Sequence, residues 1–218
     1  MAGRLFRLLP ASVRSFISRT VAPYRWAGNA TNQWLRVVMN QETNRIVDGL
    51  TPASLKVLEV SGQLWNRPGY FREYRSVGYP DYDLCKSPLD DTFDLIIAEQ
   101  VFEHLLWPYR AARNVYQMLK PGGAFLITTP FLIPIHKEPH DCTRWSETGL
   151  KYFLAECEFR LEDIQVGSWG NLPCVRANLD THWRIYQKWR HSLQNDPTYP
   201  CVVWGIARKP QLEPALMS

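Results

Sequence analysis

Residues 93–130, FDLIIAEQVFEHLLWPYRAARNVYQMLKPGGAFLITTP, decide the fold of this chain. They contain two short apolar runs, FDLIIA at 93–98 and AFLITT at 124–129, which are typical of buried strands. Between the runs, apolar residues recur at helical spacing until KPGG at 120–123, where proline and glycine stop a helix. A strand, a helix and a second strand in this order predict a parallel pair joined by a crossover helix.

The same alternation continues on both sides of this stretch. We predict further strands at residues 55–60, 74–79, 159–169 and 200–207, and further helices at 34–50, 147–156 and 175–193. Strands that alternate with helices of this length imply an α/β fold with a doubly wound, mostly parallel sheet and helices on both faces. In such sheets ligands bind beyond the carboxyl ends of the strands, so we expect the functional site there.

Length and composition favour one globular domain of catalytic size. The chain has 218 residues, of which 45% are hydrophobic, enough to bury a full core. Five cysteines without a C-x-x-C pair argue against a zinc knuckle or a disulfide framework and fit a reducing cytoplasm. The net charge of +4 is too small to indicate a nucleic-acid partner by itself.

Basic residues are concentrated at the N-terminus. The arginines that precede Glu42, the first acidic residue, are Arg4, Arg7, Arg14, Arg19, Arg25 and Arg36. We predict a basic arm with lid helices at residues 1–50, a catalytic domain at 51–210 and a tail at 211–218. Three interpretations of the arm stay open: a packing or lid helix, a helix on a membrane surface, and a targeting peptide. No segment is long and apolar enough to span a bilayer, so we expect a cytoplasmic protein with peripheral membrane contact as one option.

An acid and a glycine stand at the end of the first predicted strand. Glu59 lies near the end of this strand, and Ser61 and Gly62 allow a tight turn where a ligand can approach. An acid at this place can meet the amine of a bound methionine moiety. The same pattern also fits an ordinary strand-to-helix turn.

Three motifs together resemble a known family. FDLIIA at 93–98, EQVFEHL at 99–105 and VYQMLKPGGAFLITTP at 115–130 resemble the FDLI strand, the EHL helix start and the LKPGG turn of class I S-adenosylmethionine-dependent methyltransferases of the methyltransferase-11 type. The resemblance covers most of the chain after about residue 50. It implies a Rossmann-like fold with a seven-stranded sheet, and S-adenosyl-L-methionine as the cofactor.

The resemblance also implies a set of cofactor-binding residues. They are Glu59, Ser61 and Gly62 at the methionine and ribose, Tyr79 at the ribose, Asp83 at the adenine amine, and Glu99 and Gln100 over the cofactor. Two positions depart from the family pattern. Ser61, Leu64 and Trp65 stand where the family loop has glycines, and Tyr79 stands near the place of the usual ribose-binding acid, with Asp81 as an alternative to it.

Candidates for a general base follow the predicted strands at 93–98 and 124–129. His104 comes just after the first of them, and His136, His140 and Asp141 lie in the polar loop after the second. Methyl transfer from a sulfonium requires alignment, and removal of a proton when the acceptor is a hydroxyl. We predict His104, His136 and Asp141 as the catalytic residues.

A metal motif is present only in part. Gln100-x-x-Glu103-His104 resembles the E-x-x-E-H motif of some methyltransferases that act on vicinal hydroxyls or RNA ends, where a divalent ion activates the acceptor. Gln100 replaces the first glutamate, and a neutral amide is a poorer ligand for a hard cation. We therefore predict no metal ligands and interpret Glu103 as an acid at a helix N-terminus.

The predicted function is methyl transfer to a polar acceptor, a small molecule or a glycan, with oxygen favoured over nitrogen because of the candidate bases. An RNA methyltransferase and a catalytically degenerate scaffold protein are the alternatives. A nucleic-acid partner is not expected, because no surface that combines stacking and basic residues can be identified. The aromatic residues that are interpreted either as the wall of an acceptor pocket or as core are Trp169, Trp183, Tyr186, Trp189 and Trp204.

Overall fold

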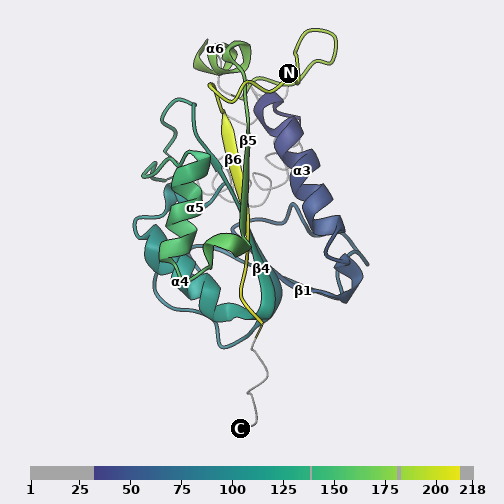
Figure 1. The fold of residues 1–218 in the computed structure, drawn as a ribbon, viewed down its shortest axis with the longest axis vertical. Coiled ribbons are helices and arrows are strands. Elements are labelled where there is room, and N and C mark those ends of the chain that lie inside the picture. The colour runs from purple at the N-terminus through teal and green to yellow at the C-terminus, as the bar shows by residue number, and fades with distance from the viewer. Residues whose placement is uncertain (1–31, 138, 181–182, 212–218) are drawn as a thin grey trace, which may run out of the picture.

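The computed structural model describes residues 32–137, 139–180 and 183–211 (Figure 1). Within these ranges one sheet has the strand order β2-β1-β3-β4-β6-β5. Its strands are β1 (Lys56–Val60), β2 (Glu73–Val77), β3 (Phe93–Glu99), β4 (Leu119–Pro130), β5 (Ile164–Trp169) and β6 (Val202–Arg208). The strands β2, β1, β3 and β4 are parallel, and β6 is antiparallel to both β4 and β5. The prediction of an α/β fold with a mostly parallel sheet is confirmed.

Helices cover both faces of the sheet. One face carries α3 (Val37–Asp48), the other carries α4 (Pro108–Met118) and α5 (Glu147–Glu156), and α6 (Leu172–Asp180) lies beyond the end of β5 (Figure 1). The helix α5 begins where predicted, because the Ser146 hydroxyl accepts a hydrogen bond from the Gly149 N–H at 3.2 Å. The helix α4 begins later than predicted, at Pro108, which lacks the N–H that a helix start leaves unpaired.

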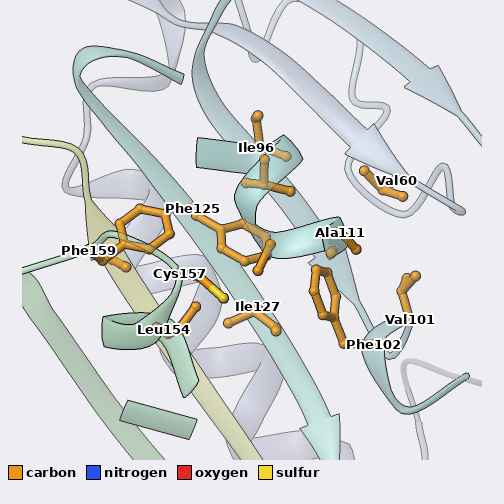
Figure 2. Packing of buried hydrophobic residues seen from close by; sticks show 14 of the residues in the cluster. Val60, Ile96, Val101, Phe102, Ala111, Phe125, Ile127, Leu154, Cys157 and Phe159 are labelled. Carbon is orange, nitrogen blue, oxygen red and sulfur yellow. The ribbon is translucent and has the colours of Figure 1, made fainter. Parts of the chain in front are cut away.

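The largest core cluster lies between the sheet and the helices α4 and α5 (Figure 2). Its buried side chains include Ile96, Phe125 and Ile127 from the central strands. The Phe102 ring packs against them, with its centroid 5.5 Å from that of Phe125. Burial of each such side chain contributes about 1.5–3 kcal/mol. Because Phe102 belongs to the segment just after β3, this core also fixes the residues that leave the strand end.

The described part of the sheet has six strands, where the resemblance implied seven. The residues between β2 and β3 form turns, and Pro80 and Pro88 there lack the N–H that a strand ladder needs. The described segment 61–72, between β1 and β2, contains no helix either. Its Trp65 and Phe71 are buried instead, in the cluster on the face that α3 covers. The segment 61–72 therefore covers part of this face without forming a helix.

The predicted helix at 175–193 is wrong beyond Asp180, where α6 ends. The described residues 183–193 form turns and irregular backbone, in which Trp183 has a φ of 59°. Two indoles satisfy carbonyls of this segment: Trp34 Nε1 donates to the Ser192 oxygen and Trp169 Nε1 to the Leu193 oxygen, both at 3.0 Å. Tertiary hydrogen bonds thus replace those of a helix.

The predicted arm and tail are only partly described. Residues 1–31 and 212–218 lie outside the described ranges, and the predicted domain boundaries stay predictions. Residues 34–48, which lie in the predicted arm, form η1 (Trp34–Arg36) and α3, and Trp34 and Met39 pack in a core cluster with Trp169 and Trp204. Of the aromatic residues that the sequence assigns either to a pocket wall or to the core, Trp169 and Trp204 are therefore core, whereas Trp189 is 82% exposed. Among the helices in the described ranges, none has the length and hydrophobicity that a membrane span requires.

We expect Gly170→Ala to destabilise the fold. A Cβ at Gly170 would lie 2.1 Å from the Tyr199 oxygen and 2.4 Å from the Cys201 nitrogen, both backbone atoms that cannot rotate away. Overpacking of this kind costs about 1–3 kcal/mol, or roughly 3–10 °C of melting temperature in a chain of this size. Thermal unfolding followed by circular dichroism measures the change.

Gly149→Ala is the matched control for this substitution. Gly149 lies in α5, and the nearest atom to its Cβ would be the Ser146 hydroxyl oxygen at 3.4 Å, an ordinary contact. Because alanine favours helix over glycine, this variant is expected to keep or slightly raise the melting temperature. Equal melting temperatures for the two variants would contradict the steric account of Gly170.

Candidate active site

Three strand ends meet at one edge of the sheet. Val60 pairs with Ala98 and Glu99 pairs with Thr128, so the carboxyl ends of β1, β3 and β4 lie side by side. Ser61 and Gln100, just beyond two of these ends, have φ angles of 59° and 56°. Residues other than glycine adopt this left-handed conformation rarely, and such residues cluster at functional sites. This edge is the candidate active site.

Glu59 is 1% exposed, and its carboxylate accepts hydrogen bonds from the loop that follows β1. Oε1 accepts a hydrogen bond from the Leu64 N–H at 2.9 Å, and Oε2 accepts from the Trp65 N–H at 3.1 Å and from the Tyr74 hydroxyl at 2.5 Å. Burial raises the pKa of Glu59, although these hydrogen bonds oppose the shift. The side chain shapes the loop, and its predicted contact with a cofactor stays a prediction.

Gly62 and Trp65 complete this loop. A Cβ at Gly62 would lie 2.5 Å from Glu59 Oε1, so the folded-back carboxylate leaves room only for glycine. Trp65 joins two strand ends, since its backbone N–H donates to Glu59 and its indole Nε1 donates to Glu99 Oε2 at 3.2 Å. The large residue that departs from the family pattern therefore links the two acids of the predicted cofactor site.

Glu99 also contacts Arg36, a buried cation that the sequence did not assign to the site. Arg36 Nη1 lies 3.4 Å from Glu99 Oε1, and the side chain is almost fully buried. Burial lowers the pKa of Arg36, while Glu99 and Glu103 act in the opposite direction. The Arg36 Nε is buried and has no hydrogen-bond partner among the described residues. A buried guanidinium with a free donor is suited to bind a carboxylate.

These features fit the methionine end of S-adenosylmethionine. The free Nε of Arg36 matches the carboxylate of that moiety, and Glu99, beside it, offers a negative charge to the amine. A groove of about 440 Å³ lies between α3 and the loop after β1, lined among others by Asn40, Trp65 and Glu99. This volume falls in the range of small-molecule sites, about 300–1,000 Å³.

The residues predicted for the ribose and the adenine lie beyond β2. The Ser61 N–H donates to the Val77 oxygen at 2.7 Å, which places the end of β2 beside the loop after β1. Tyr79, two residues further on, is 76% exposed. Asp83 caps its own turn, because its Oδ1 accepts from the Cys85 N–H at 3.0 Å. Their roles at the cofactor stay predictions.

A second polar group, formed by Glu103, His104 and His136, lies beyond β3 and β4. One potential ligand atom from each residue lies within 4.8 Å of those of the other two. Glu103 is 0% exposed, and among the described residues neither of its carboxylate oxygens has a hydrogen-bond partner. Burial raises the pKa of Glu103 to about 8, although the nearby backbone N–H of Glu103, Arg36 and Arg144 act in the opposite direction. A carboxyl group with this pKa is mainly protonated at pH 7 unless a cation compensates its charge.

The tautomer of His104 follows from its contacts. Its Nδ1 lies 2.6 Å from the His140 carbonyl oxygen, and a carbonyl only accepts, so Nδ1 carries the proton. In the neutral ring the lone pair is then on Nε2, which lies 3.6 Å from Glu103 Oε1. In the part of the chain that the structure describes, neither ring nitrogen of His136 has a hydrogen-bond partner. Burial lowers the pKa of His136 to about 4, so its ring is neutral at pH 7.

Asp141 shares a loop with His136 and has other partners. Its carboxylate forms a bidentate ion pair with Arg144 and accepts a hydrogen bond from the His136 N–H at 2.7 Å. Although burial acts in the opposite direction, these contacts hold the pKa of Asp141 below its ordinary value. Asp141 thus holds the backbone that carries His136, and its predicted role as a base stays a prediction.

Sequence reasoning missed Arg36 and misplaced Glu103. The sequence places Arg36 in the basic arm. The apolar residues Trp34 and Leu35 next to it are the signal in the sequence that its side chain could be buried. Glu103 was interpreted as a helix N-terminal acid, but it lies in the single turn η3 (Phe102–His104), apart from α4. Gln100, which was expected over the cofactor, donates through Nε2 to the Thr128 hydroxyl at 3.1 Å.

Comparisons with known proteins agree with this fold. Residues 53–127 match the family model described as a methyltransferase domain, Methyltransf_11. This range includes β1, β3 and the turn at the start of β4, which are the elements that build the candidate site. A search of curated proteins found no match.

Several solved methyltransferases share the fold. An S-adenosylmethionine-dependent methyltransferase from Thermotoga maritima has a TM-score of 0.56 and 15% identity over 88% of this chain and 98% of its own. Phosphoethanolamine N-methyltransferase 2 from Haemonchus contortus, solved with S-adenosyl-L-methionine, has a TM-score of 0.53 and 15% identity over 93% of this chain and 61% of its own. At such identities these likenesses show the fold alone.

We expect Arg36→Gln to weaken binding of the cofactor's amino-acid end selectively. Loss of a charge-assisted hydrogen bond costs about 1.5–3 kcal/mol, so the Kd for S-adenosylhomocysteine should rise roughly 10- to 100-fold. The Kd for methylthioadenosine, which lacks the carboxylate and the amine of the amino-acid end, should stay unchanged. Isothermal titration calorimetry measures both ligands.

Arg45→Gln is the control, because Arg45 lies in α3, the helix that directly follows Arg36, with its side chain largely exposed and paired with Glu42. It should bind both ligands as the unchanged chain does. A parallel loss of both ligands in Arg36→Gln would instead assign Arg36 a purely structural role.

Proposed function

We propose that this chain, a class I S-adenosylmethionine-dependent methyltransferase, transfers the methyl group to a hydroxyl oxygen of a polar small molecule or glycan. The observation that carries the proposal is the position of Glu103, His104 and His136. They follow β3 and β4 at the same edge of the sheet as the cofactor loop, and one polar atom of each lies within 4.8 Å of those of the other two. An acceptor hydroxyl there would lie between proton-binding groups and the cofactor site.

The protein has three tasks in this reaction. S-adenosylmethionine supplies an electrophilic methyl group on sulfonium and leaves as a neutral thioether. Arg36, Glu99 and the loop held by Glu59 would bind and orient the methionine end. The group of Glu103, His104 and His136 is the place where the acceptor hydroxyl is deprotonated. A neutral amine already has a free electron pair, so this group favours oxygen over nitrogen as the acceptor.

A basic groove next to this group supports a polar acceptor. The His136 ring lies 5.1 Å from that of Trp183, and Trp183 lines a groove of about 620 Å³. Arg176, Arg184 and Arg190 also line this groove. Guanidinium groups pair well with carboxylates and phosphates, which favours an acceptor with negative charge near the methylated hydroxyl.

Labelled S-adenosylmethionine tests the acceptor class directly. The full chain is incubated with a panel of neutral sugars, acidic sugars, glycans, small amines and RNA oligonucleotides, and label in each product is counted. We expect transfer to an acidic hydroxyl compound and none to the amines. Transfer to RNA that falls steeply with salt would assign the chain to RNA methylation and overturn the proposal.

His104→Ala should reduce the rate of methyl transfer at saturating cofactor and leave S-adenosylhomocysteine affinity unchanged. Loss of proton removal from the acceptor costs about 10²- to 10⁴-fold in rate. Lys137→Ala, an exposed position in the loop after β4, serves as the control and should retain activity. Single-turnover measurements separate the two effects, and a His104→Ala variant with unchanged transfer would exclude this site for deprotonation.

A further inference from the structure

The charges at this edge of the sheet do not balance. Asp141 is paired with Arg144, and Glu99 is paired with Arg36 at 3.4 Å. Glu103 remains, fully buried and without a hydrogen-bond partner. A carboxylate in this position costs several kcal/mol unless a proton or a cation compensates it.

The surroundings of Glu103 resemble those of a metal ligand more than those of a protonated acid. A protonated carboxyl group donates one hydrogen bond, and two oxygens without partners leave that donor unused. His104 donates its Nδ1 proton to the His140 carbonyl, the arrangement by which proteins fix a metal-binding histidine with Nε2 free. Both ring nitrogens of His136 are buried and have no hydrogen-bond partner within the described ranges.

We infer that Glu103, His104 Nε2 and His136 bind a divalent transition-metal cation. The inference deepens the proposed function, on which its catalytic meaning rests. The distance of 3.6 Å between His104 Nε2 and Glu103 Oε1 is close to the separation of two ligands that each lie about 2.1 Å from one ion. The third ligand comes from the neighbouring strand end, so the site exists only in the folded chain.

This ligand set was not predicted from the sequence, because Gln100 interrupts the glutamate motif. In the structure the Gln100 side chain donates a hydrogen bond to the Thr128 hydroxyl at 3.1 Å. His136, 32 residues after His104, takes the third position.

The type of cation follows from the ligand chemistry. Two imidazoles and one carboxylate suit first-row transition metals, whereas Mg²⁺ prefers oxygen ligands in an octahedron. Three protein ligands also leave coordination positions open. An acceptor hydroxyl bound at such a position becomes more acidic, and its proton then leaves to solvent while the oxygen attacks the methyl carbon.

Metal titration of the EDTA-treated full chain tests the inference without cofactor or acceptor. Mn²⁺ is the main probe, because the exposed Cys142 thiol, near His104, would attract softer ions. We expect one Mn²⁺ per chain by calorimetry, and Mg²⁺ at least tenfold weaker. Glu103→Gln and His136→Ala should each raise the Mn²⁺ Kd at least tenfold.

Matched controls separate this site from surface binding. Glu156→Gln changes an exposed glutamate on α5, and His140→Ala removes an exposed imidazole from the same loop as His136. Both should bind Mn²⁺ as the unchanged chain does. A loss in His140→Ala equal to that in His136→Ala would point to surface imidazoles and overturn the site.

Thermal unfolding provides a second measurement and shows that the variants fold. Saturating Mn²⁺ should raise the melting temperature of the unchanged chain and not that of Glu103→Gln. Without metal, Glu103→Gln should melt at the same or a higher temperature, because it removes a buried charge. Absence of Mn²⁺ binding would overturn the metal site, while the proposed methyl transfer could still be tested. Mn²⁺ binding without methyl transfer to any acceptor would contradict the proposed function and leave the metal site standing.

Discussion

The parallel backbone register of β1, β3 and β4 is the constraint on which the rest of this structure depends. Hydrogen bonds between these strands pair Val60 with Ala98 and Glu99 with Thr128, so three chain segments leave the sheet at one edge. Each segment is then held close to its strand. The Gln100 N–H donates to the Thr128 oxygen at 3.0 Å, and Phe102 inserts into the main core. The residues between these two anchors and just beyond them have little freedom to move.

Within the described ranges, the buried charged residues lie at this edge, whereas apolar side chains cover the faces of the sheet. Arg36, Glu59 and Glu103 are each nearly inaccessible to solvent. Glu59 is satisfied by three hydrogen bonds within its loop, so its burial is compatible with a stable fold. Within the described ranges, Arg36 and Glu103 keep atoms without hydrogen-bond partners, which a stable interior normally avoids. The free energy that this costs is the physical reason for the ligands proposed at both residues.

The two faces of the sheet are covered in different ways. The helices α4 and α5 pack on one face in the usual way, with the Phe102 and Phe153 rings 6.0 Å apart between them and the sheet. The other face is covered by α3 together with the segment 61–72. Trp65 and Phe71 of this segment occupy space that a crossover helix would fill. The indole of Trp65 then reaches Glu99, which couples the covering of this face to the cofactor site.

The fold class, most of the strands and the sheet edge that carries the candidate site could be predicted from the sequence. Local patterns suffice for this, because apolar runs, a serine cap at Ser146 and the KPGG stop act on neighbouring residues. They fail where long-range contacts override local preference, as in residues 183–193, whose carbonyls accept hydrogen bonds from the indoles of Trp34 and Trp169. The burial of Arg36 beside Glu99 could not be predicted in this way. Nor could the position of Glu103 next to His104 and His136, without a hydrogen-bond partner in the described ranges. Burial and pairing of charges depend on which strand ends become neighbours in space, and this is set by sheet register, which no local pattern encodes.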